Sequence, residues 1–105
     1  MAEPDEPLLK HTITPAGDGT VVVVLEGELD IATAVPLNEA VRTVIDTVTN
    51  CLVVDAGQLR FADSSAIALW VSWSQRVPRI EIRNPSPIVR RVIETMGLET
   101  TLNPS

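Results

Sequence analysis

The stretch that decides the fold is CLVVDAGQLRFADSSAIALWV, residues 51–71, in which a polar loop separates two apolar segments. The first segment, 51–54, is rich in valine and ends at Asp55 and a glycine-containing turn, a pattern that predicts a buried strand. The triplet Asp63-Ser64-Ser65 precedes the second segment, and such side chains accept hydrogen bonds from the free N–H groups that open a helix. The stretch therefore predicts a strand, a loop and a helix over 65–75.

Two adjacent hydroxyl groups, those of Ser64 and Ser65, fall where this loop becomes a helix. A dianion at that place would meet the positive end of the helix dipole and unpaired N–H donors. The position is therefore suited to carrying a phosphate as a switch. The purely structural alternative is a helix cap, which contributes about 0.5–2 kcal/mol to stability.

Length, composition and charge limit the function. The 105 residues predict a single domain over 8–105 behind a short acidic arm, 1–7. The formal charge of −6 argues against nucleic acid as a partner, and no segment approaches the roughly 20 apolar residues of a membrane span, so we expect no direct membrane contact. The lone Cys51 is interpreted as a small buried hydrophobe in a cytoplasmic protein.

The remaining sequence supplies further strands and helices. They are an edge strand over 8–14, a central strand buried on both faces over 20–25, an amphipathic helix capped by Thr33 and ended by Asn50, and a half-exposed strand over 79–83. Glu26–Asp30 is interpreted as a break after the central strand.

A last helix is predicted from Ser86, a natural N-cap, followed by Pro87 in the first turn. Gly97 supplies a left-handed C-cap, with Leu98 folding back onto the helix. Its apolar face consists of Ile88, Val92, Ile93 and Met96. The order β-β-α-β-α-β-α indicates an α/β fold, a mixed sheet with helices packed on it and right-handed parallel crossovers.

The sequence favours neither catalysis nor metal binding. Ser64, His11 and Asp55 could be drawn as a triad, but no Gly-x-Ser-x-Gly elbow surrounds the serine. No glycine-rich phosphate loop is present, and His11 has no ligand-type residue at metal spacing. We therefore expect no enzyme activity, no cofactor and no metal. Trp70 and Trp73 lie on one helix, where one is expected to fill the core and the other is a candidate partner contact.

Three blocks resemble a known family: GELDIATAVPLNEAV, VVDAGQLRFADSSAIALWV and NPSPIVRRVIETMGL. They are similar to signature blocks of STAS domains, above all of bacterial anti-sigma factor antagonists. The resemblance spans residues 8–102 and implies the STAS fold without an active site of its own. It also implies a partner, an anti-sigma factor that is a serine kinase of the histidine-kinase-like ATPase fold, whose binding frees the sigma factor.

The same resemblance implies roles for individual residues. The kinase would phosphorylate Ser64, the first serine of the family motif, and so end the complex. Asp30, Asp63 and Ser65 would support the partner-binding surface. Ala66 also belongs to this surface, and it stands where the family usually has glycine.

Two other functions remain open at this point. Small STAS domains also serve as cytoplasmic subunits of lipid-transport ATP-binding-cassette complexes, and the apolar run over 66–70 favours such a permanent contact. A scaffold subunit of a stress-sensing assembly is a third alternative. As an antagonist, the protein is expected to be a monomer or a weak dimer.

Overall fold

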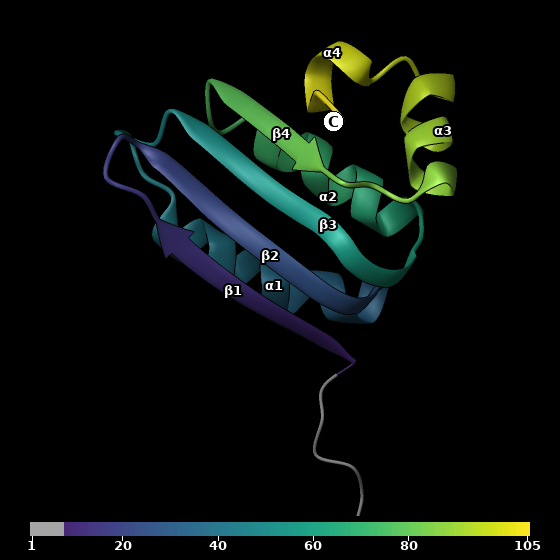
Figure 1. Ribbon diagram of the computed structural model, residues 1–105. Helices are drawn as coiled ribbons and strands as arrows, with labels where there is room; N and C mark the ends of the chain where they lie inside the picture. Colours follow the sequence, from purple (N-terminus) through teal and green to yellow (C-terminus); the bar gives the residue numbers. More distant parts are fainter. Residues whose placement is uncertain (1–7) are drawn as a thin grey trace, which may run out of the picture.

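The computed structural model describes residues 8–105, which are organised by a four-stranded mixed sheet (Figure 1). The strands are β1 (Leu9–Pro15), β2 (Thr20–Leu29), β3 (Cys51–Ala62) and β4 (Arg79–Arg83), in the spatial order β1-β2-β3-β4. β1 is antiparallel to β2, whereas β3 is parallel to both of its neighbours. The predicted arm, 1–7, lies outside the described residues.

Within residues 8–105, four helices connect or follow the strands. They are α1 (Ile31–Val44), α2 (Ser64–Ser74), α3 (Pro87–Thr95) and α4 (Glu99–Leu102). α1 and α2 cover one face of the sheet, and α3 and α4 lie beyond β4 (Figure 1). The α/β class and the predicted order of elements are confirmed, and the short α4 is an addition that the sequence pattern did not predict.

Burial along β2 shows that helices cover only one face of the sheet. Val21, Val23 and Leu25 are buried beneath the helices, whereas Val22 and Val24 between them remain partly exposed. The prediction of a strand buried on both faces is therefore wrong. A valine run fits a one-sided sheet as well, since β-branched side chains suit either face of a strand.

Both central strands are longer than predicted. β2 does not stop at the predicted break, Glu26–Asp30, but continues to Leu29. It can do so because Gly27, at φ +115°, absorbs an irregularity in the register. β3 continues beyond Asp55, whose carboxylate accepts the Gly57 N–H at 2.9 Å without ending the strand. The added halves pair with each other, from Glu26 opposite Gln58 to Leu29 opposite Ala62.

The predicted limits of the first helix are also wrong. α1 begins at Ile31 because Asp30, not Thr33, is its N-cap, and it ends at Val44 rather than at Asn50. Ile45 already has extended backbone angles. Of the apolar residues in this segment, Leu37 and Val41 are buried, whereas Val35 and, beyond the end of α1, Val48 are exposed.

Candidate functional site

The parallel sheet places two aspartates side by side. β2 and β3 end at a register pair, Leu29 and Ala62, and the next residues are Asp30 and Asp63. The Asp63 N–H donates to the Leu29 carbonyl at 3.4 Å, which links the two strand ends directly. Asp30 caps α1 and Asp63 caps α2, so the two helices open from the same edge of the sheet.

The serine pair lies in the first turn of α2. The Asp63 carboxylate accepts the Ser65 N–H at 2.8 Å, and the Asp63 carbonyl accepts the Ala66 N–H at 3.0 Å. Ser64 is exposed, Ser65 is half-buried and Ala66 is completely buried. Of the two hydroxyls, that of Ser64 is therefore the more accessible to an enzyme, at the positive end of the helix dipole.

Asp30 is held by a reciprocal capping box. Its carboxylate accepts the N–H groups of Ala32 and Thr33 at 2.9 and 3.0 Å, while the Thr33 hydroxyl accepts the Asp30 N–H at 2.9 Å. The hydrogen bond from the Thr33 N–H is the main cause that holds the pKa of the Asp30 carboxyl below its ordinary value. The edge around Ser64 thus carries an ionised carboxylate at neutral pH.

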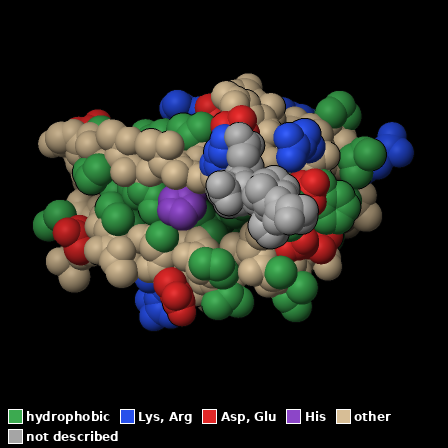
Figure 2. Space-filling view, turned by 90° about the horizontal axis from the view of Figure 1, so that it is seen from below, with side chains coloured by type: hydrophobic (Ala, Val, Ile, Leu, Met, Phe, Trp, Pro, Cys, Tyr) green, Lys and Arg blue, Asp and Glu red, His purple; other side chains and the backbone are tan. Residues whose placement is uncertain are grey.

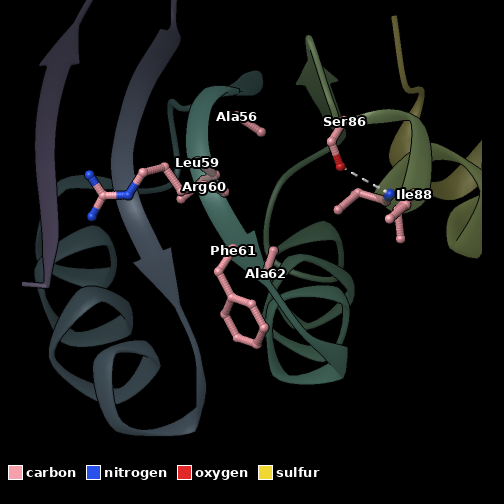
Figure 3. A pocket seen from close by; sticks show the side chains of 8 residues that line it. Ala56, Leu59, Arg60, Phe61, Ala62, Ser86 and Ile88 are labelled. Atoms are coloured by element: carbon pink, nitrogen blue, oxygen red, sulfur yellow. Dashed lines mark hydrogen bonds between the residues drawn. The ribbon is translucent and has the colours of Figure 1, made fainter.

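A hollow opens beside Ser64, between α2 and α3. It has a volume of about 160 Å³, and its lining consists of Ala62, Asp63, Ser64, Ile67, Ile88, Val89 and Val92. A second hollow of about 220 Å³ shares Ala62, Ile88 and Val89 with it and extends along β3 beneath α3 (Figure 3). The two form one apolar groove, called the α3 groove below, with Ser64 at one end.

Exposed apolar side chains line the α3 groove. Phe61 is 49% exposed, Ile88 76% and Val92 36%. In Figure 3, Phe61 and Ile88 approach the hollow from β3 and α3. Of the predicted apolar face of the last helix, Ile93 is buried, whereas Ile88, Val92 and Met96 are exposed. The amphipathic pattern of the helix indicated an apolar face, but it does not distinguish a face that packs in the core from one that is open to a partner.

The ends of α3 are formed as predicted. The Ser86 hydroxyl accepts the Val89 N–H at 3.2 Å, the bond drawn in Figure 3. Gly97 adopts φ +71°, and the Leu98 N–H reaches back to the Ile93 carbonyl at 2.9 Å. These caps hold α3 over the groove although few of its side chains are buried.

Both tryptophans belong to the core. Trp70 and Trp73 have no exposed surface, so the prediction of a partner contact from one of them is wrong. The Trp73 indole donates to the Asn38 Oδ1 at 2.8 Å, which ties α2 to α1. The Trp70 indole N–H is buried without a hydrogen-bond partner in the described chain.

The other candidate residues lie apart from Ser64. His11 lines a separate hollow between β1 and α1, and Asp55 lies within β3, opposite Val24 and Arg83. The structure thus does not bring Ser64, His11 and Asp55 together as a triad. Residues 8–105 contain no group of three metal-ligating side chains.

Cys51 is half-buried at the start of β3 rather than fully buried as predicted. It shares the uncovered face of the sheet with its register partner Arg79. Burial raises the pKa of its thiol above the ordinary value. No helix within the described chain is long and apolar enough to cross a bilayer.

Comparison with known proteins identifies the family to which this architecture belongs. The family model described as "Mlab, STAS domain" matches residues 14–104. RsfB of Mycobacterium tuberculosis, an anti-sigma-F factor antagonist, is 29% identical over 105 residues that cover 96% of this chain and 83% of RsfB.

Two solved structures of the anti-sigma factor antagonist SpoIIAA are similar as well. The unphosphorylated form is 26% identical, with a TM-score of 0.78 over 91% of this chain and 88% of SpoIIAA. The phosphorylated form, from Bacillus, is 25% identical, with a TM-score of 0.74 over 91% of each chain. Since the family model covers most of the sequence, the chain belongs to the STAS domain family.

Proposed function

We propose that this protein is an anti-sigma factor antagonist that acts in the cytoplasm by binding an anti-sigma factor and carries out no catalysis itself. The similarity to RsfB and SpoIIAA, both described as antagonists, supports this function. The observation that carries the proposal is the position of Ser64, exposed in the first turn of α2 at the end of the α3 groove.

The partner-binding surface would combine a polar centre with an apolar flank. Asp30, Asp63, Ser64 and Ser65 form the centre, and Ala66 supports it from the core. The α3 groove supplies apolar area that water leaves on binding, which is the main favourable term in most protein association. In the unmodified protein, such a surface would bind the anti-sigma factor without a covalent step.

Phosphorylation of Ser64 would reverse this binding. An anti-sigma kinase would transfer the γ-phosphoryl group of ATP to the Ser64 oxygen, releasing ADP and the hydroxyl proton. The phosphate adds about −1.5 to −2 charges at neutral pH. It would stand at the edge of the sheet that carries the capping carboxylates of Asp30 and Asp63, next to an apolar groove, where a partner would have to desolvate it.

The fold is suited to tolerate this modification. The α2 N-terminus favours negative charge, so the phosphate would not unfold the helix that carries it. SpoIIAA has been solved in both forms, and this chain resembles both with TM-scores of 0.78 and 0.74. The switch would therefore act on the surface while the fold persists.

Phosphosite mapping tests this proposal. The purified protein is incubated with Mg-ATP and each histidine-kinase-like ATPase encoded in the same genome, followed by intact-mass and peptide analysis. We expect a single phosphate on Ser64, retained in the Ser65→Ala variant and absent from Ser64→Ala. Transfer to another residue by a kinase that binds the protein, or no transfer by any, would contradict the phosphorylation switch.

The lipid-transport alternative has lost its main support. It rested on an apolar run over 66–70 that would dock permanently on a transporter. Four of these five side chains, Ala66, Ile67, Leu69 and Trp70, are buried in the core of the protein itself. The run therefore stabilises the fold and offers little surface to a partner.

A further inference from the structure

The two edges of the sheet differ in how they are protected. Along β4, the Ser105 N–H donates to the Ile82 carbonyl at 3.0 Å and the Asn103 amide donates to the Ile80 carbonyl at 2.8 Å. Pro104 bridges to Ile82. The chain after α4 thus closes this edge. β1, at the other edge, has β2 as its one strand neighbour within residues 8–105.

The backbone groups that β1 leaves open can be assigned. The Leu8 carbonyl accepts the Glu28 N–H at 2.9 Å and so points toward β2. Because these directions alternate along an antiparallel ladder, Lys10, Thr12 and Thr14 also direct their N–H and C=O groups toward β2. Leu9, His11 and Ile13 therefore direct theirs to the open edge.

An apolar hollow runs beside this edge. It measures about 250 Å³ between β1 and α1, and its lining consists of Leu8, Leu9, His11, Ala32, Thr33, Pro36 and Leu37. Figure 2 shows the histidine, in purple, among hydrophobic side chains. An added strand would therefore find hydrogen bonds along the edge and an apolar site for alternate side chains, the two elements of β-strand addition.

Charge and symmetry favour a second copy as that strand. The chain carries 14 acidic residues against 8 basic ones, yet β1, LKHTITP, contains no acid and one lysine. Two negatively charged copies can thus approach at β1 without placing acids of the paired strands against each other. A two-fold axis also makes two identical strands antiparallel, so one surface serves both copies.

We propose that the protein forms a homodimer in which β1 pairs antiparallel with β1 of a second copy, with the two-fold axis at Thr12. This register pairs His11 of one copy with Ile13 of the other, so the outward N–H and C=O groups of both residues are satisfied. Thr12 faces Thr12 on the uncovered face of the sheet. Leu9 and Ile13 lie on the helix side. Ile13 is opposite His11 of the other copy, which lines the hollow of that copy.

Dimerisation at this edge is compatible with partner binding but does not depend on it. β1 and the α3 groove lie at opposite edges of the sheet (Figure 1). A dimer would therefore present two copies of the Ser64 surface to two partner molecules. The register also keeps Lys10 of each copy opposite Thr14 of the other rather than opposite a second lysine.

A charge swap at Thr12 tests the dimer. Thr12 is exposed, so neither Thr12→Asp nor Thr12→Lys should disturb the monomer, which thermal unfolding of dilute samples checks. Sedimentation equilibrium of the wild type should show a dimer. Each variant alone should associate at least about tenfold more weakly, because like charges then face each other across the axis.

Mixing the two variants decides the register. An equimolar mixture of Thr12→Asp and Thr12→Lys should restore a heterodimer, since opposite charges then meet at the axis. The same pair of substitutions at Thr100, an exposed residue of α4 beyond the opposite edge of the sheet, should leave association unchanged. A wild type that stays monomeric, a dimer indifferent to charge at Thr12, or a mixture that does not re-associate would each overturn the proposal.

Discussion

At the scale of single residues, Asp30 and Asp63 each have two roles. Both carboxylates satisfy free N–H groups at the start of a helix. Both also stand at the edge of the sheet that holds Ser64, because β2 and β3 end in register there. The fold thus fixes the positions of both carboxylates at this edge, where they would oppose a phosphate.

The first prediction concerns the capping box of α1. Asp30→Ala should lower the thermal midpoint on the order of 4–8 °C, because the N–H groups of Ala32 and Thr33 lose their acceptor. The pKa of the Asp30 carboxyl is depressed, so the capping stabilisation is complete above the ordinary value of about 3.9 and disappears as the pH falls below it. Melting curves of both proteins should therefore converge in strong acid.

Asp46 provides a control for this prediction. Its carboxylate also accepts a nearby N–H, that of Val48 at 3.0 Å, but it opens no helix. Asp46→Ala should lower the midpoint less than Asp30→Ala. An equal loss would mean that the capping of α1 contributes nothing particular to stability.

The second prediction distinguishes the two buried indoles. Trp73→Phe should cost about 1 kcal/mol more in unfolding free energy than Trp70→Phe, since it leaves the Asn38 amide oxygen without its donor. Trp70→Phe removes a ring of the same size whose N–H has no partner in the described chain. Urea titration measures both, and a larger loss for Trp70→Phe would contradict the assignment.

The sequence predicts the capping roles of individual polar residues better than it predicts how side chains pack around them. Asp63 and Ser86 were predicted near or at helix starts, because a polar side chain there precedes an apolar series. Asp30 was missed as a cap because Thr33, three residues on, is an equally good candidate, and the box uses both. The burial of both tryptophans depends on contacts between α1 and α2, which local spacing does not contain.

At the scale of elements, glycine decides where a strand can bend without ending. Gly27 lies within β2 at φ +115°, and a Cβ atom there would collide with the Leu8 carbonyl oxygen. That carbonyl accepts the Glu28 N–H, so the bend is part of the pairing between β1 and β2. The bend lets β2 reach the edge where Asp30 caps α1.

The third prediction follows from this collision. Gly27→Ala should destabilise the protein by about 1–3 kcal/mol, because both the backbone angle and the contact with Leu8 are unfavourable. Gly17→Ala is the matched control, since a Cβ there meets nothing within 4 Å. Chemical denaturation should find the control within about 0.5 kcal/mol of the wild type. Equal losses for the two variants would contradict the role of Gly27.

The sequence pattern did not predict where β2 and β3 end. Glu26–Asp30 and Asp55–Gly57 contain acids and glycine, residues that usually mark turns. In the fold, Glu26 to Leu29 pair with Gln58 to Ala62, and Asp55 pairs with Val24, so long-range pairing between β2 and β3 outweighs the local preference of both segments. The strand over 79–83 was predicted correctly because its alternation of charge and isoleucine reflects the one buried face directly.

At the scale of the whole molecule, one concentration of exposed apolar side chains lies on and beside α3. The helix is held by its caps and by Ile93, while Ile88 and Val92 remain exposed over the groove. On this side of the molecule, α2, α3 and the end of β3 converge. The mixed α/β fold was predictable from the order of elements, but the groove arises only when these three meet.

The fourth prediction assigns partner binding to this groove. Ile88→Asp should weaken binding to the anti-sigma kinase about tenfold or more while leaving stability unchanged, since the side chain is 76% exposed. Val48→Asp is the control, because Val48 is 70% exposed but precedes β3, at the opposite end from Ser64. Calorimetric titration measures both variants, and an unaltered affinity of Ile88→Asp would place the partner elsewhere.

The most direct test of the account is the affinity of the anti-sigma kinase for two forms of this protein, unmodified and carrying phosphoserine at position 64. A control for added negative charge carries Thr47→Glu, in the loop before β3 and away from the site. We predict that the phosphate weakens binding by roughly 5- to 150-fold, the range of a coupling of about 1–3 kcal/mol, with the control unaffected. Equal affinities of the two forms would contradict a switch at Ser64.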